Sequence, residues 1–118
     1  MLHFGVVTLF NIMDWIKVFP TSVAARQTLL NDRPQLVIIG EYRICLVLHN
    51  ENLLAIQDKC THNGESLSKG RVTHLGEVIC PWHGYRFNLK TGRESDERSR
   101  DLVTFPVKEN EDGVFIGL

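Results

Sequence analysis

Two short segments of the chain each carry a cysteine and a histidine close together. Cys60 stands two positions before His62, and Cys80 stands three positions before His83. A cysteine thiolate and a neutral imidazole are both strong ligands for zinc and iron. Because each segment supplies one ligand of each kind, the four residues predict a metal centre with two sulfur and two nitrogen ligands.

Two kinds of metal centre use this set of ligands. One is a single tetrahedral zinc ion, and the other is a two-iron cluster with both thiolates on one iron and both imidazoles on the other. Zinc fingers commonly present the cysteine pair first and the histidine pair later in the chain. Here each segment offers one ligand of each kind, which favours the two-iron cluster. A zinc-stabilised interaction module is the alternative.

Strands that end just before each pair can hold these ligands in place. A predicted strand over residues 53–58 precedes the first pair, and another over residues 77–79 precedes the second pair. Gly64 and Gly84 follow the two pairs and leave the backbone free to turn close to a bulky group. We therefore expect two hairpin loops that bind the metal centre within residues 59–88.

The rest of the chain is expected to form short β-strands and one short helix near the N-terminus. From residue 36 onward the apolar residues recur with a period of two between turn signals, which is typical of antiparallel sheets. Thr21 or Ser22 can cap a helix over residues 21–30. The predicted fold class is all-β, an antiparallel β-sandwich or small barrel. Further strands are expected at residues 13–19, 36–40, 42–48, 103–107 and 114–118, with Val23, Ala24, Gln27 and Leu30 along one helix face.

Length and composition describe an ordinary globular protein. The 118 residues, of which 43% are hydrophobic and 23% charged, predict a single domain over residues 1–118. A net charge of -1 gives no electrostatic basis for binding nucleic acid or an anionic membrane surface. No apolar run approaches the roughly 18 residues of a membrane-spanning helix. The three cysteines do not suggest a disulfide framework, so a reducing compartment, the cytoplasm, is expected.

Residues 1–12 are mostly apolar and precede a second methionine, Met13. They lack the basic region and the cleavage site of a signal peptide. Two interpretations stay open: the segment is an extension ahead of a true start at Met13, or it is a genuine edge strand or partner-binding segment.

The pattern C-x-H followed by C-x-x-H resembles the Rieske [2Fe-2S] family. The resemblance runs from about Trp15 to Leu118 and includes residues 104–107, which are similar to a segment typical of small Rieske ferredoxins. It implies one Rieske-type [2Fe-2S] cluster and a Rieske-like fold. The ligand assignment that it implies places Cys60 and Cys80 on one iron and His62 and His83 on the solvent-facing iron.

The sequence resembles the low-potential, oxygenase-associated ferredoxin branch of that family. The respiratory-complex branch carries two further cysteines, at the positions held here by Glu65 and Trp82. It also carries a serine and a tyrosine whose hydroxyls bond cluster sulfurs, at the positions of Tyr85 and Phe87. Such hydrogen bonds raise the potential, so their loss implies the low end of the Rieske range of about -150 to +300 mV.

The function implied is that of a soluble electron carrier without catalytic residues of its own. One electron would pass from a flavoprotein reductase to a terminal oxygenase or a similar acceptor. The chain is too short to hold the catalytic iron domain of an oxygenase as well. The alternative that keeps the cluster is a small subunit of a nitrite-reductase-like complex.

Five other features are not expected to bind the metal. Cys45 is expected in the core, and His49 and His74 are expected to be solvated beside turns. The charged run over residues 93–101 is expected to be a solvated loop, with a border of the docking surface as the alternative. Trp82 stands between two ligands and is expected to contact a partner or to shield the cluster.

Overall fold

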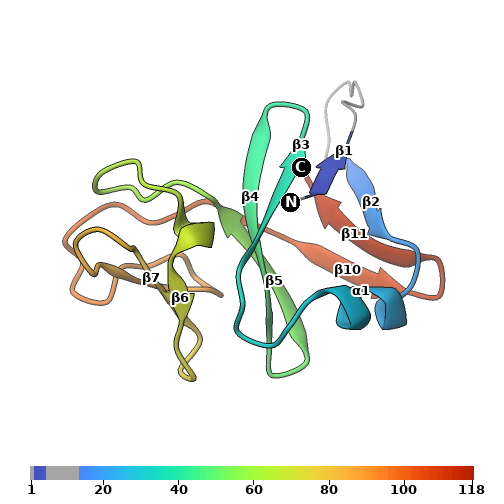
Figure 1. The fold of residues 1–118 in the computed structure, drawn as a ribbon. Coiled ribbons are helices and arrows are strands. Elements are labelled where there is room, and N and C mark those ends of the chain that lie inside the picture. Colours follow the sequence, from blue (N-terminus) through green and yellow to red (C-terminus); the bar gives the residue numbers. More distant parts are fainter. Residues whose placement is uncertain (1, 5–13) are drawn as a thin grey trace.

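The computed structural model describes residues 2–4 and 14–118, which form strands in three sheets and one short α-helix (Figure 1). The loops that carry the predicted ligands lie at one end of the molecule, far from the C-terminus. No helix among these residues is long and apolar enough to span a membrane. The elements are β1 (Leu2–Phe4), β2 (Trp15–Phe19), α1 (Ser22–Thr28), β3 (Gln35–Ile39), β4 (Tyr42–His49), β5 (Asn52–Gln57), the 3-10 helix η1 (Leu67–Lys69), β6 (Arg71–Val72), β7 (Glu77–Ile79), β8 (Arg86–Asn88), β9 (Thr104–Phe105), β10 (Val107–Asn110) and β11 (Gly113–Gly117).

The central sheet has the strand order β1-β3-β4-β5-β9. Strands β3, β4 and β5 form consecutive antiparallel hairpins, whereas β1 pairs with β3 in parallel at the edge. Residues 2–4 therefore form an edge strand, which is one of the two interpretations open for residues 1–12. Residues 1 and 5–13, which include the first residue of the strand predicted over 13–19, lie outside the part of the chain that the structure describes.

A second sheet, β10-β11-β2, packs against one face of the central sheet. Side chains from both sheets meet in one hydrophobic core, so the two layers form a sandwich. Within the described residues the sheets stay open and no barrel closes. The fully buried members of this core include Val37, Ile44, Leu46, Val114 and Ile116.

The opposite face of the central sheet carries the third sheet, β6-β7-β8, and the loops around it. Cys45, Val47 and Ile56 point to this side and share a second core with Val78 and Phe87. Strand β4 is buried on both faces for this reason, and its apolar residues run without interruption from 44 to 48. The ligand loops are thus built directly on the middle of the sandwich.

The helix is shorter than predicted and buries a different face. It spans Ser22–Thr28, and the Thr21 hydroxyl caps it by accepting a hydrogen bond from the Ala24 N–H at 2.9 Å. Ala25 and Leu29 are buried, whereas Val23 is 65% exposed and Leu30 is 59% exposed. The predicted face was wrong because within α1 Ala25, and not Val23 or Gln27, is buried, and Leu30 lies beyond the end of the helix at residue 28.

The predicted strand over residues 103–107 was also wrong, since it is divided at Pro106 between two sheets. Strand β9 pairs with β5, and β10 pairs with β11. Proline has no N–H to donate to a ladder, so the pairing stops there and the chain crosses to the second sheet. The Pro106 carbonyl still accepts a hydrogen bond from Gly117 at 2.9 Å.

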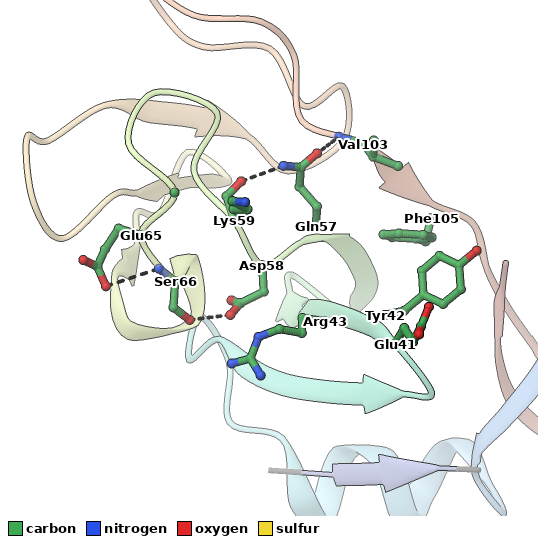
Figure 2. Close-up of a pocket in the computed structure, with 11 residues that line it drawn as sticks. Glu41, Tyr42, Arg43, Gln57, Asp58, Lys59, Glu65, Ser66, Val103 and Phe105 are labelled. Carbon is green, nitrogen blue, oxygen red and sulfur yellow. Dashed lines mark hydrogen bonds between the residues drawn. The ribbon is translucent and has the colours of Figure 1, made fainter. Parts of the chain in front are cut away.

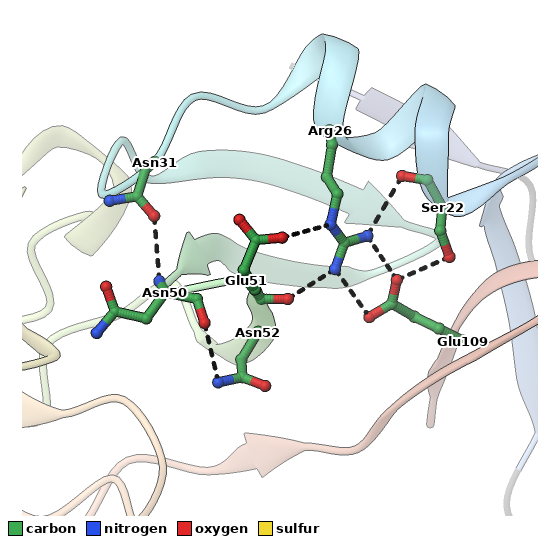
Figure 3. A network of polar contacts seen from close by, with 7 residues as sticks. All are labelled: Ser22, Arg26, Asn31, Asn50, Glu51, Asn52 and Glu109. Carbon is green, nitrogen blue, oxygen red and sulfur yellow. Dashed lines mark hydrogen bonds and ion pairs between the residues drawn. The ribbon is translucent and has the colours of Figure 1, made fainter.

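Arg26 joins three separate elements through one guanidinium group (Figure 3). Its Nη1 donates to Glu109 at 2.6 Å, and its Nη2 donates to the Glu51 carbonyl at 2.6 Å. Ser22 donates to the same Glu109 carboxylate at 2.9 Å. The hydrogen bond from Arg26 lowers the pKa of Glu109. The network ties α1 to β10 and to the turn between β4 and β5.

Replacing Arg26 by alanine should lower the free energy of unfolding by about 1 kcal/mol at low salt, because a partly exposed ion pair is lost. High salt should shrink the difference, since it screens the pair in the wild type. Chemical denaturation at two ionic strengths measures both effects. Arg33→Ala is the matched control, because Arg33 makes no ion pair among the described residues. Equal losses in the two variants at both ionic strengths would contradict the expectation.

Candidate metal centre

The two predicted loops have the same backbone turn. The Gly64 N–H donates to the Cys60 carbonyl at 2.8 Å, and the Gly84 N–H donates to the Cys80 carbonyl at 3.2 Å. Both glycines have positive φ, at 79° and 73°. Residues with a side chain rarely adopt this conformation, so the glycines let each loop turn back behind its cysteine. The two loops are therefore two copies of one ligand-presenting turn.

The structure brings the four predicted residues together in two layers. Cys60 and Cys80 are buried and lie in the second hydrophobic core. His62 and His83 are exposed, and their ring centroids are 5.2 Å apart. Burial raises the pKa of the Cys60 thiol. The sulfur atoms thus lie on the inner side of the loops and the imidazoles on the outer side.

The layered arrangement suits a group with two metal atoms. In the part of the chain that the structure describes, no three histidine, cysteine, aspartate or glutamate side chains surround a single ion position. A tetrahedral zinc site needs all four ligands around one point. Two thiols on one side and two imidazoles on the other match a cluster with a different pair of ligands on each iron.

Asn63 provides a second test of whether these residues fit such a cluster. Its Nδ2 is buried and has no hydrogen-bond partner among the described residues. Its Oδ1 accepts a hydrogen bond from the Glu65 N–H at 3.0 Å and lies 3.7 Å from the Cys80 sulfur. A buried amide donor without a partner is rare in proteins. Sulfur acceptors beside Cys80 would supply one, so the residues fit an iron–sulfur group.

Asp58 fixes the start of the first loop. Its Oδ1 accepts from the Ser68 N–H at 2.6 Å, its Oδ2 accepts from the Ser66 hydroxyl, and its own N–H donates to the Arg43 carbonyl at 3.0 Å. This carboxylate lines an open groove of about 760 Å³, and Figure 2 shows the residues around it. In the same groove the Gln57 side chain donates to the Lys59 carbonyl at 2.7 Å. The first loop is thereby anchored to β4 and β5.

The charged run over residues 93–101 is a mostly exposed loop, as the sequence suggested, but it buries one carboxylate and contacts the first ligand loop. The Thr61 hydroxyl donates to the Arg100 carbonyl at 2.7 Å, so this segment is bonded to the first ligand loop. Glu94 is 0% exposed. Its carboxylate accepts from the Arg98 Nε at 3.0 Å, from the Arg98 Nη2 at 2.9 Å and from two backbone N–H groups. These bonds satisfy the buried charge, and the Arg98 side chain lowers the pKa of Glu94 to about 2.

Both His49 and His74 were expected to be solvated. His74 is exposed, but His49 is buried. The His49 Nδ1 lies 2.6 Å from an Asp32 carboxylate oxygen, and the other side of its ring covers Gly76. A Cβ at position 76 would lie 3.1 Å from the His49 Nε2. His49 therefore packs under the turn between β6 and β7 and supports the third sheet. Asp32 and Gly76 are distant from His49 in the sequence, so the residues next to His49 in the chain did not predict its burial.

Cys45 is in the core, as predicted, and Trp82 is exposed in the second ligand loop. Cys45 is buried in β4, and all three cysteines are free thiols. Trp82 is 66% exposed between the second pair of predicted ligands. Phe87 is fully buried in the second core, whereas Tyr85 lies beside the first histidine with its ring stacked on it. The sequence analysis considered Tyr85 only as a position where the respiratory-complex branch has a residue that bonds a cluster sulfur. It did not predict the contact with His62.

Comparison with known proteins gives a consistent result. The family model for the Rieske [2Fe-2S] domain matches residues 19–106. Apoptosis-inducing factor 3 from Homo sapiens is 38% identical over 96 residues, which are 80% of this chain but only 16% of that protein. The chain therefore spans about a sixth of the length of that relative. The ferredoxin component of the alkene monooxygenase system from Xanthobacter autotrophicus is 32% identical over 67% of this chain and 65% of its own.

A solved structure shows the same architecture. The match is a chain in the complex of reduced oxygenase and oxidised ferredoxin in carbazole 1,9a-dioxygenase. It aligns with a TM-score of 0.73 and 25% sequence identity, over 86% of this chain and 99% of the other. Together with the match of the family model over most of the chain, the paired loops place this sequence among proteins that carry one Rieske-type cluster. The chain belongs to the Rieske [2Fe-2S] domain family.

Proposed function

We propose that this protein carries one electron at a time from a flavoprotein reductase to a terminal oxygenase or a similar acceptor. The observation that carries the proposal is the layering of the two loops, with thiols inside and imidazoles exposed. An exposed imidazole edge lets a partner approach the redox group closely. The ferredoxin component of an alkene monooxygenase system supports this role, since it is similar over two thirds of the chain.

In this proposal Cys60 and Cys80 bind one iron, and His62 and His83 bind the other. The bound cluster supplies a one-electron redox couple whose charge is less negative than that of an all-thiolate cluster, which favours reduction. The buried Asn63 amide lies beside Cys80, with its Oδ1 3.7 Å from that sulfur, and its Nδ2 would be available to donate to a group held by the loops. The Trp82 side chain stands at the outer edge, where a partner would dock.

We further propose that residues 1–118 form one domain, with cluster-binding loops over 59–88, and that the chain is not catalytic alone. Strand β4 contributes side chains to both hydrophobic cores, which supports a single unit. Three free cysteines support a reducing compartment such as the cytoplasm.

Metal analysis combined with spectroscopy tests the cofactor and its ligands. The purified protein should contain iron and acid-labile sulfide in equal amounts and lose its visible colour on reduction with dithionite. Reduced protein labelled with nitrogen-15 at histidine should show nitrogen couplings to the EPR signal, because the imidazoles bind iron. A colourless protein that holds one zinc ion would instead establish the zinc-stabilised module.

Electron delivery is tested separately with the cluster-loaded protein. A flavoprotein ferredoxin reductase with NADH should reduce the cluster at a rate that saturates with carrier concentration. The reduced carrier should then be reoxidised by an oxygenase of the ferredoxin-dependent class. A chain that resists reduction by the flavoprotein and co-purifies with a large reductase subunit would favour the nitrite-reductase-like alternative.

A further inference from the structure

A stack of three side chains connects the segment over residues 93–101 to one proposed iron ligand. The rings of Tyr85 and His62 are stacked, with centroids 3.9 Å apart and planes at 11°. The Arg98 guanidinium carbon lies 3.9 Å from the centroid of the same Tyr85 ring. Tyr85 is therefore the shared member of an aromatic and a cation–π contact.

The buried Glu94 carboxylate holds Arg98 in this stack. Two of its nitrogens bond the two carboxylate oxygens of Glu94, at 3.0 Å and 2.9 Å. A two-point contact of this kind fixes the plane of a guanidinium. Glu94 is 0% exposed, and its carboxylate also accepts two backbone N–H groups. Asp96 lies further out, at 3.7 Å, and is exposed. The guanidinium is thus a fixed charge against Tyr85.

We propose that Arg98 and Tyr85 are positioning residues for His62, and that the charge of Arg98 raises the reduction potential of the cluster. The inference rests on the proposed function, because His62 must bind iron for the stack to act on the redox group. The stack restricts rotation of the imidazole ring. The guanidinium places positive charge on the side of the site where the exposed iron would be bound.

The direction of the effect follows from the charge balance of the redox step. Reduction adds one electron, supplied by a flavoprotein reductase, and no bond to Arg98 or Tyr85 forms or breaks. The loaded site becomes one unit more negative, and a fixed positive charge nearby stabilises that state. The Glu94 carboxylate, and Asp96 at 3.7 Å from the guanidinium, weaken this effect, whereas the Arg98 guanidinium is the charged group that contacts Tyr85.

Three substitutions and one control test the inference by potentiometric EPR titration of the loaded protein. Arg98→Gln should lower the midpoint potential, and Arg98→Lys should restore most of it. Tyr85→Leu should shift or broaden the EPR features that report imidazole orientation. Arg93→Gln removes an exposed cation of the same segment, whose one ion pair among the described residues is with exposed Glu97 at 3.8 Å, and it should match the wild type.

The readouts separate a positioning role from a merely structural one. A purely structural Arg98 would change thermal unfolding but leave the potential and the EPR features of the folded, loaded protein as in the wild type, which would overturn the inference. If Arg98→Gln does not load, Arg98→Lys and Tyr85→Leu decide the matter: unchanged EPR features in Tyr85→Leu would overturn it. A wild-type protein without iron, sulfide or an EPR signal would refute the proposed function itself.

Discussion

Replacing Cys80 by alanine should abolish the visible absorbance of the protein and its acid-labile sulfide, whereas Cys45→Ala should retain both. Cys80 and Cys60 are buried together at the inner side of the two loops, and alanine supplies no ligand. Cys45 is equally buried, but it lies within β4. Cys45 therefore stands outside the two loops that present the predicted ligand pairs. Iron and sulfide per chain, with the visible spectrum, measure the outcome.

The Cys45→Ala variant controls for the general effect of removing a buried sulfur. Both substitutions remove one buried sulfur from the same hydrophobic core, so packing losses are comparable, about 1 kcal/mol for a small cavity. Circular dichroism should show folded protein in both cases. Retention of full iron content in Cys80→Ala, or its loss in Cys45→Ala, would contradict the ligand assignment.

The predicted ligand pairs could be recognised in the sequence for a local reason. Each pair is local, and each is preceded by a strand whose apolar period is visible. Structure confirms that β5 and β7 end just before Cys60 and Cys80. The two faces of β4 could likewise be assigned, since Ile44 and Cys45 point to different cores. Local spacing and strand period thus predicted the sheet and the loops.

Contacts between distant segments could not be predicted in this way. Glu94 stands in a mostly exposed polar run, and only the fold shows that its own carboxylate is buried and satisfied by Arg98 and backbone N–H groups. The stack of Tyr85 on His62 requires both loops to meet. Pro106 marks a strand boundary, but the sequence does not say that the chain changes sheets there. Polar residues with distant partners give no periodic signal.

Glu94→Gln should lower the free energy of unfolding by about 2 to 3 kcal/mol near neutral pH, because it removes the charge from a buried ion pair. The lowered pKa of Glu94 shows that the folded protein favours the ionised carboxylate. The Arg98 side chain is 41% exposed, so solvent screens part of the interaction and moderates the loss. Glu97→Gln is the matched control, since Glu97 is an exposed carboxylate of the same segment and should change stability little.

The pH dependence of this difference has a definite sign. Glu94 has a pKa lowered from 4.5 to about 2 in the folded state, so its ionised form stabilises the fold above the unfolded value and the benefit is lost as pH falls towards about 2. Glutamine does not titrate. The gap between wild type and Glu94→Gln should therefore be constant from pH 7 to about 5 and shrink below about 4.5. Chemical denaturation followed by tryptophan fluorescence at several pH values measures the gap, and acid effects on the cluster are common to both proteins. A gap that widened on acidification would show that the ion pair with Arg98 is not what keeps this carboxylate charged.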